Sequence, residues 1–315
     1  MNISRRWRVI STFPKDEPLP SDIIVVSLPP DSTIHALLRL LSDPNEQVAR
    51  TIQDQLACLG SDVLPFLEQT VTEDATLQPR VAYIKEEICF GQLKDEFQRF
   101  VSQSARQEDW EQGAFLIAKL AYPDLSIPHY VECLDHLADE FRTKWHAIAS
   151  PSEKVARLLS TFLFKDKGFS GNRTQYYDAD NSYLNRVLET RQGIPISLSA
   201  LYVFVGKRLG LPVVGVGMPG HFLVKLEGET PPQFVDCFNG GTMLCEKDCE
   251  QFITASGLDY HPQLLEKSST PTILARILRN ILSIYEREHE DQRARRVQAL
   301  LELLDIEQTD PESPR

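Results

Sequence analysis

Hydrophobic positions in the N-terminal half of the chain recur every three or four residues, which is the spacing of one face of an α-helix. The pattern predicts short helices followed by longer ones, over residues 35–43, 43–60, 61–71, 81–103, 110–125, 128–149 and 150–168. Asp43 and Pro44 predict the start of the second helix and Gly60 its end, and Ser61 is the expected N-cap of the third. Residues 1–30 contain five scattered prolines and are expected to form an extended arm.

The pattern changes after Gly171. A helix over 198–210 is apolar on all sides, which indicates burial on all sides. Three short apolar runs then predict strands over 213–218, 221–228 and 232–238, and two amphipathic helices follow over 272–288 and 291–305. The predicted fold class is therefore α+β, with a mostly helical N-terminal half, a core with a small antiparallel sheet, and a helical tail.

Composition narrows the range of partners. Hydrophobic residues make up 42% of the 315 positions and charged residues 25%, as in ordinary soluble proteins, and the formal net charge is -12. Because nucleic acids and anionic lipids attract basic surfaces, this charge argues against either as the main partner. The sequence contains no apolar run of about 18 residues and no signal-peptide pattern, so we expect a cytoplasmic protein with free thiols.

The cysteines offer no convincing metal set. Cys237, Cys245 and Cys249, with His261, are the nearest approach to one, but their spacing does not match a zinc motif. We therefore expect no metal and no other cofactor.

His221 and Asp236 are the candidate chemical pair. His221 opens one predicted strand after Pro219 and Gly220, and Asp236 lies in the next, among apolar residues. A carboxylate can fix the tautomer of a histidine that takes a proton from a nucleophile. The alternative is a structural contact, because a carboxylate in such a strand is costly unless it is paired.

A nucleophile for this pair is harder to find. Ser197 carries the nearest hydroxyl, in the first turn of the apolar helix. Serine is also common in the first turn of helices that have no catalytic role. Cys237 follows Asp236 directly, and side-chain alternation along a strand points it to the opposite face. Ser197 is therefore the candidate nucleophile, and Cys237 is the alternative.

Several strings resemble known families. The segments GNRTQYYDADNSYLNRVLETRQGIPISLSALY, GLPVVGVGMPGHFLVK and FVDCFNGG resemble SirB-type transglutaminase-like proteins, which carry a degenerate transglutaminase core and a TPR-like tail. The two short helices that begin near Asp43 resemble a single HEAT-type repeat over about 40 residues. The resemblance implies four parts: an extended arm over 1–30, a HEAT-like region over 31–108, a transglutaminase-like core over 109–265, and a TPR-like hairpin with its tail over 266–315.

Within that resemblance, His221 takes the place of the general base and Asp236 that of its orienting partner. Gly193 falls at a glycine of true transglutaminases, and Pro195 falls at their catalytic cysteine. The usual Asp-Pro-Phe string of the family reads Asp236-Cys237-Phe238 in this chain. The candidate binding residues around the site are Asn181, Tyr183, Arg191, Pro195 and Asn239.

The missing cysteine favours a non-catalytic module that binds a peptide or protein partner in the residual cleft, with a regulatory role. One alternative is an amide-bond hydrolase or acyltransferase that uses His221 and Asp236 with a nucleophile other than cysteine. The other is a structural adaptor in which the pair has no function. The sequence leaves the oligomeric state open.

Overall fold

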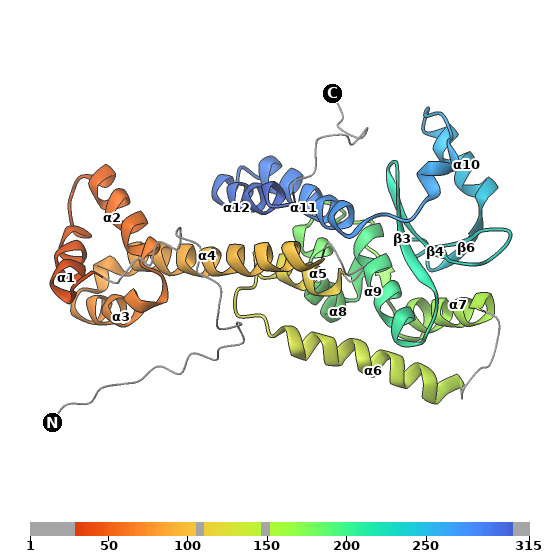
Figure 1. The fold of residues 1–315 in the computed structure, drawn as a ribbon, viewed down its shortest axis with the longest axis horizontal. Helices are drawn as coiled ribbons and strands as arrows, with labels where there is room; N and C mark the ends of the chain where they lie inside the picture. Colours follow the sequence, from red (N-terminus) through yellow and green to blue (C-terminus); the bar gives the residue numbers. More distant parts are fainter. Residues whose placement is uncertain (1–28, 105–109, 146–151, 305–315) are drawn as a thin grey trace, which may run out of the picture. The chain divides into compact units, whose positions relative to one another are not determined.

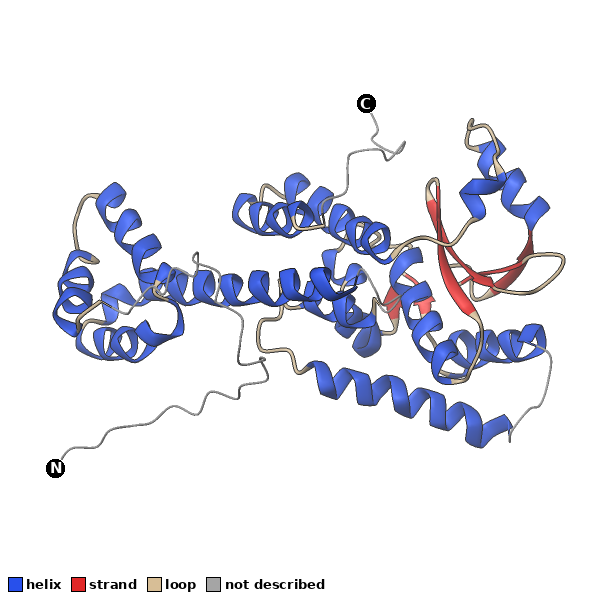
Figure 2. Cartoon of the chain, in the orientation of Figure 1, coloured by secondary structure: helices blue, strands red, loops and turns tan. Residues whose placement is uncertain are grey.

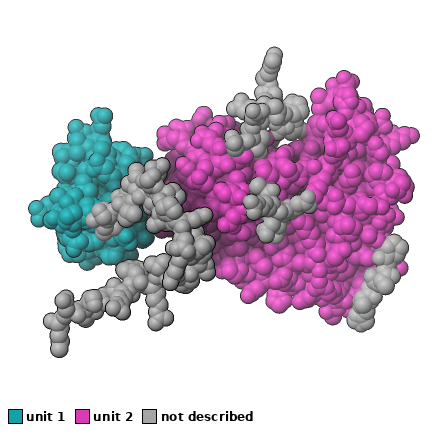
Figure 3. All heavy atoms as spheres, in the orientation of Figure 1, with its two compact units in different colours: residues 1–84 teal, residues 85–315 magenta. Residues whose placement is uncertain are grey.

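The structure, a computed structural model, describes residues 29–104, 110–145 and 152–304. Nearly all of the predicted extended arm lies outside these residues. The chain divides into two compact units, Met1–Ile84 and Lys85–Arg315, each with its own internal contacts (Figure 3). The boundary between the units falls within one long helix, α4 (Gln78–Ser104).

The first unit is helical, as the periodicity predicts. It contains α1 (Asp31–Leu40), α2 (Glu46–Cys58), the 3-10 turn η1 (Gly60–Val63), α3 (Leu64–Glu73) and the turn η2 (Ala75–Leu77), which leads into α4. Its core is made by apolar side chains from successive helices: Ile34, Leu41, Ala49, Leu56, Val63 and Leu67.

Two predicted helix caps in this unit are wrong. The side chain of Asn45, and not that of Asp43, caps α2 by accepting from the backbone N–H groups of Gln47 and Val48. Asp43 instead accepts a hydrogen bond from the backbone of Asn45 at 2.8 Å, which shapes the turn before the helix. Ser61 lies in the 3-10 turn, and α3 begins three residues later without a side-chain cap. Both Asx residues can cap a helix, and the one adjacent to the first helical residue does so.

The second unit contains most of the helices (Figure 1). They are α5 (Glu111–Ala118), α6 (Ile127–Trp145), α7 (Ser152–Ser160) with a π-helical continuation η3 (Thr161–Asp166), the turn η4 (Ala179–Ser182), α8 (Leu184–Thr190), α9 (Pro195–Arg208), α10 (Glu246–Ala255), the turn η5 (Pro262–Leu265), α11 (Thr270–Arg287) and α12 (Asp291–Glu302). The helix predicted over 110–125 ends at Ala118, before its proline. The sequence patterns did not predict α10.

A four-stranded antiparallel sheet lies at one end of this unit (Figure 2). Its strands, in spatial as well as chain order, are β3 (Val213–Met218), β4 (His221–Leu226), β5 (Gln233–Asp236) and β6 (Thr242–Cys245). The first three confirm the predicted strands, and β6 was not predicted. A short parallel pair, β1 (Ser170–Gly171) with β2 (Gln192–Gly193), lies just before α9.

Helix α9 is the centre of the second unit. It is buried from Pro195 to Gly206 and packs against β3 and β4 on one side and against α6 on another. At its C-terminal end, Arg208 forms ion pairs with Glu111 of α5 and Asp135 of α6, both at 2.6 Å. These contacts fix α9 relative to the sheet, so they also fix the start of the helix near the candidate site.

Candidate functional site

The sheet has two covered faces, and the candidate pair lies on only one of them. Side chains alternate along a strand. Phe222 and Val224 of β4 and Val235 of β5 belong to the large core that includes α9. Leu223 and Phe234 belong to a smaller core that is completed by Cys249 and Ile253 of α10. By the same alternation, His221 and Asp236 lie on the α10 face.

The pair is in close contact on that face. Nε2 of His221 lies 3.0 Å from Oδ1 of Asp236, and both side chains are more than nine-tenths buried. The two atoms are as close as in an ion pair. They do not form a hydrogen bond, because the ring N–H is not oriented toward the carboxylate oxygen. The register of β4 and β5 explains this contact. Val224 of β4 pairs with Val235 of β5, so His221 and Asp236 are diagonal neighbours on the two strands.

Asp236 is held as a carboxylate. Burial alone would raise its pKa, but the close approach of His221 and two hydrogen bonds from Asn239 outweigh burial and lower the pKa. Asn239 donates from its backbone at 3.1 Å and from Nδ2 at 2.6 Å. The side-chain oxygen of Asn239 in turn accepts from Arg173. The predicted residue Asn239 is therefore the group that orients Asp236.

Aromatic rings surround His221. The ring of Phe252 from α10 is stacked on it, with centroids 5.5 Å apart and planes at 28°. Phe238 meets it edge-on at 6.4 Å, and Tyr176 meets Phe238 at 5.9 Å. Arg173 lies over the Phe238 ring at 4.9 Å. Two rings, those of Phe238 and Phe252, therefore contact the histidine directly. Tyr176 and Phe252 are 38% and 43% exposed to solvent.

Two glycines permit this geometry. Gly220 turns the chain between β3 and β4 with φ 67°, a conformation that favours glycine, and it sets the position of His221 at the start of β4. A Cβ atom on Gly171 would lie 2.6 Å from the ring of Phe238. Glycine at 171 therefore allows the close approach of the aromatic ring beside His221.

The hydroxyl groups of α9 are engaged elsewhere. Ser197 donates to the carbonyl oxygen of Asn181 at 2.5 Å and accepts from the backbone of Ile194 at 3.0 Å. Ser199 donates to the carbonyl oxygen of Phe222 at 3.4 Å. Within residues 29–104, 110–145 and 152–304, His221 forms no hydrogen bond with a hydroxyl or thiol group.

Cys237 lies on the α9 face, as strand alternation predicts. It is completely buried, and burial raises its pKa well above the ordinary thiol value although a hydrogen bond with Ser199 opposes this. A neutral thiol on the opposite face of the sheet is a poor nucleophile for a reaction at His221. Pro195 is buried at the first position of α9, where its fixed φ suits a helix start.

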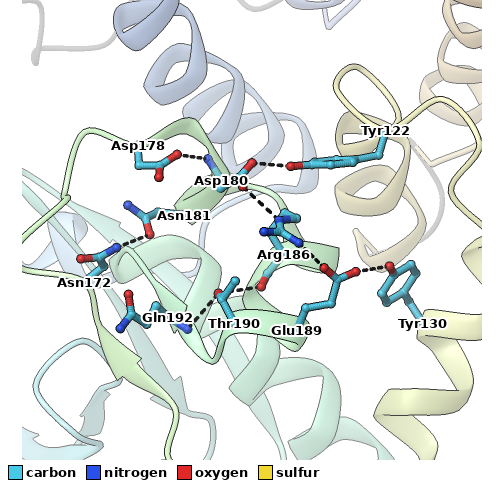
Figure 4. A network of polar contacts seen from close by, with 10 residues as sticks. All are labelled: Tyr122, Tyr130, Asn172, Asp178, Asp180, Asn181, Arg186, Glu189, Thr190 and Gln192. Atoms are coloured by element: carbon cyan, nitrogen blue, oxygen red, sulfur yellow. Dashed lines mark hydrogen bonds and ion pairs between the residues drawn. The ribbon is translucent and has the colours of Figure 1, made fainter.

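Two other predicted residues lie inside the molecule. Asn181 accepts from Asn172 at 3.0 Å and donates to the carbonyl oxygen of Gln175 at 2.6 Å, within the polar network of Figure 4. The hydroxyl of Tyr183 is 2.7 Å from that of Tyr285 in α11, and both rings are buried. Burial, then the neighbouring tyrosine, raises the pKa of Tyr183. A partner could reach either residue only through its neighbours.

The structure does not bring Arg191 to the His221 site. Its side chain lines a separate cavity between α6 and α8. The sequence patterns did not identify Phe252, Tyr176 and Arg173 as site residues. Their contacts depend on how other segments pack against the sheet, and strand alternation does not predict that packing. The only sequence signal was the cluster of aromatic residues at 176–177 ahead of the apolar helix.

The described part of the chain contains no group of three or more His, Cys, Asp or Glu side chains placed to hold a metal ion. In the same residues, no helix combines the length and the apolar composition that crossing a bilayer would require.

Comparison with known proteins places the sheet and α9 in a recognised domain. Residues 128–279 match the Transglutaminase-like superfamily. A UPF0162 protein of Xylella fastidiosa (strain 9a5c) is 38% identical over 189 residues, which cover 58% of this chain and 67% of that protein. A second, from strain Temecula1, is 37% identical over 198 residues and 70% of its length.

Similarity also extends to an animal protein. F-box only protein 21 of Mus musculus is 37% identical over 147 residues, which cover 44% of this chain but 23% of that protein. No solved structure gives a significant match. The extent of the similarity to the Xylella proteins is decisive, and the chain belongs to the UPF0162 protein family and carries a transglutaminase-like domain.

Proposed function

We propose that this chain is a non-catalytic, SirB-type transglutaminase-like module that binds a peptide or protein partner on the surface around His221. The proposal rests on the location of the apolar side chains that are exposed to solvent. In the described part of the second unit, the large apolar side chains exposed to solvent are Tyr176, Tyr177, Phe252 and Leu258. We call Tyr176, Tyr177, Phe238 and Phe252 the aromatic rim. Phe238 and Phe252 contact the ring of His221, Tyr176 contacts Phe238, and Tyr177 contacts Tyr176.

The aromatic rim has the composition of a binding surface. Aromatic and arginine side chains are enriched where proteins bind one another, because they combine large apolar area with a polar or charged group. Arg287 lies over the ring of Tyr177 at 3.9 Å, and Arg173 lies over Phe238. A peptide with an apolar anchor and an acidic neighbour would complement these rings and guanidinium groups.

Among the residues that the structure describes, no hydroxyl or thiol is placed to exchange a proton with His221, and this argues against catalysis. A nucleophile must reach its base within hydrogen-bond distance, roughly 2.6–3.2 Å, although such contacts can be looser without substrate. The hydroxyl of Ser197 is held by Asn181 and Ile194, and the thiol of Cys237 is on the other face of the sheet. Proline occupies the position that the resemblance assigns to the cysteine.

One observation favours the enzyme alternative. His221 and Asp236 keep the arrangement of a base and its orienting carboxylate, and the pKa of Asp236 is lowered as that role requires. An amide hydrolase would then have to activate a water molecule directly. The adaptor alternative differs again, because partner binding would depend on the helical regions over 31–108 and 266–315 and not on the pair.

The occurrence of a similar segment in a longer protein supports the view that this domain is a module. In F-box only protein 21 the similar segment is less than a quarter of the protein, so there it is joined to other parts. A role as one binding part, brought to its target together with other segments, is consistent with that arrangement. In this chain we propose that the HEAT-like region over 31–108 and the TPR-like hairpin over 266–315 are such accompanying parts.

A displayed peptide library, selected on the whole chain, tests the proposal. The peptides recovered are titrated calorimetrically against wild type, Phe252→Ala and Tyr177→Ala, with Val48→Ala as a matched control, since Val48 is an exposed apolar residue of the first unit. We expect each rim variant to weaken binding at least tenfold and the control to leave it unchanged. Selected peptides that bind all four proteins equally would overturn the proposal.

A further inference from the structure

A second cavity lies in the same unit but away from the aromatic rim. It has a volume of about 300 Å³ and is formed by α6, by the chain around Lys167 and by the end of α8. Cavities that hold small molecules begin at about this size. Its floor is apolar, with Phe169 97% buried and Leu188 beside it, and its walls carry charged and imidazole groups. None of its lining residues belongs to the His221 site.

The two carboxylates that line the cavity already form ion pairs within the protein. Glu140 is paired with Lys167. Glu189 accepts from the hydroxyl of Tyr130 and is paired with Arg186, as Figure 4 shows. These contacts satisfy both carboxylates without help from a ligand.

In the described part of the chain, two basic groups of the cavity have no such contact, whereas Lys167 is paired with Glu140. Among the residues that the structure describes, the side chains of Arg191 and His136 form no hydrogen bond or ion pair. Both line the cavity, so a guanidinium and an imidazole face the same space with their donors unused. A planar guanidinium binds a carboxylate or a phosphate through two parallel hydrogen bonds.

The backbone at Arg191 strengthens the case. Arg191 adopts φ 61° and ψ 21° at the C-terminal cap of α8, a position where glycine is usual. Two backbone hydrogen bonds hold it there, from its own N–H to Val187 and from Ser170 to its carbonyl, both at 2.9 Å. The chain thus carries an arginine where the backbone would favour glycine, and two backbone hydrogen bonds fix the position of its Cα atom beside the cavity.

We propose that this cavity binds a small carboxylate that carries a short apolar group. The carboxylate lies against the guanidinium of Arg191, and the apolar group lies on Phe169 and Leu188. A singly charged carboxylate suits the site better than a phosphate dianion, because Glu140 and Glu189 at the walls oppose a second negative charge. The volume limits the apolar group to a branched chain of a few carbons or a single ring. This site is independent of the function proposed for the aromatic rim.

Matched probes test the proposal on the full chain. Phenylacetate and 4-methylpentanoate are compared with their neutral amides and with inorganic phosphate by saturation-transfer NMR and calorimetry. Peptides that end in leucine, with a free or an amidated C-terminus, distinguish a peptide terminus from a free acid as the source of the carboxylate. We expect an acid or a free-terminus peptide to bind at least tenfold more tightly than its amide, and phosphate to bind more weakly.

A thiol inside the cavity reports where the probe binds. Cys133 lines the cavity, whereas Cys58 is an exposed thiol of the first unit and serves as the internal reference. Bound carboxylate should slow the alkylation of Cys133 relative to Cys58, as measured by mass spectrometry of the labelled peptides. Equal protection by acid and amide, or protection of neither thiol, would contradict the proposal.

Arg191→Gly separates the role of the side chain from folding. Because glycine suits the backbone at this position, the variant should melt at the same or a higher temperature than wild type while it loses carboxylate binding at least tenfold. Arg191→Lys should keep part of the affinity, and Arg295→Gln, which removes an exposed arginine outside the cavity, should keep all of it. Full affinity in Arg191→Gly would overturn the assignment.

Discussion

The ring of Phe252 is stacked on the ring of His221, at a centroid distance of 5.5 Å, so a helix that follows the sheet covers the candidate site. His221 is 7% exposed, whereas Phe252, which covers it, is 43% exposed. The solvent-facing side of the site is therefore an aromatic ring, and a partner would meet Phe252 before it met the histidine.

Phe252→Ala should uncover His221 without unfolding the protein. The ring pair contributes about 0.5–1.5 kcal/mol beyond its area, and Phe252 is already 43% exposed, so the loss is small against a free energy of unfolding of about 5–15 kcal/mol. We expect diethyl pyrocarbonate to modify His221 several times faster in the variant, as measured by peptide mass spectrometry. Leu258→Ala, which removes another exposed apolar side chain of the same unit, is the control. An unchanged rate would mean that Phe252 does not cover the histidine in solution.

Asp236→Asn should reduce stability in a manner that depends on pH. The folded state lowers the pKa of Asp236 below its ordinary value of 3.8, so the ionised carboxylate stabilises the fold above pH 3.8. This contribution is lost as the pH falls below 3.8 and through the folded-state pKa. We expect a loss of about 1–3 kcal/mol near pH 7.

The pH dependence is measured by urea unfolding of wild type and Asp236→Asn between neutral and strongly acidic conditions. The difference between the two free energies of unfolding should shrink below pH 3.8. Asp259→Asn, at an exposed position, should show no such difference. A constant difference across the pH range would show that ionisation of Asp236 contributes nothing to the fold.

Ser197→Ala should behave as a structural variant. The hydroxyl joins the start of α9 to the loop at Asn181, and its loss leaves two buried backbone groups without a partner. We expect a cost of about 1–3 kcal/mol in urea unfolding. A fluorophosphonate probe should leave no adduct on Ser197 in wild type, and an adduct found there would instead support a serine nucleophile.

Tyr183→Phe should lower stability and leave peptide binding unchanged, because the hydroxyl contacts Tyr285 in the interior. Each single replacement with phenylalanine should cost about 1 kcal/mol. The double variant Tyr183→Phe with Tyr285→Phe should cost less than the sum, since the first change already removes the shared hydrogen bond. Additive costs would mean that the two hydroxyls do not interact.

The sequence predicted the regular parts of this fold well. The three apolar runs that became β3, β4 and β5 have the length of strands, and the burial of α9 follows from its uniformly apolar sequence. Strand β6 was missed because none of its four residues is buried, whereas three of the four residues of β5 are. Helix α10 was missed because its sequence, EKDCEQFITA, shows few apolar positions. Patterns detect elements that bury a continuous face, and these two do not.

The same limit explains which parts of the site were predictable. The approach of His221 to Asp236 follows from two neighbouring strands with correct alternation. The stacking of Phe252 depends on where α10 folds back over the sheet, and the placement of Arg191 depends on how α6 passes α8. Such contacts are set by packing between distant segments, and local periodicity carries no information on them.

The most direct test of the central claim combines binding and turnover in one sample. A peptide selected on the chain is incubated with wild type and with His221→Ala, and its affinity, its mass and the mass of the protein are measured. We predict that the wild-type protein binds the peptide, that the peptide is recovered with its mass unchanged, and that the protein gains no covalent adduct. A cleaved or modified peptide, or an acylated protein, that appears with wild type and not with His221→Ala would contradict a non-catalytic module and identify an enzyme.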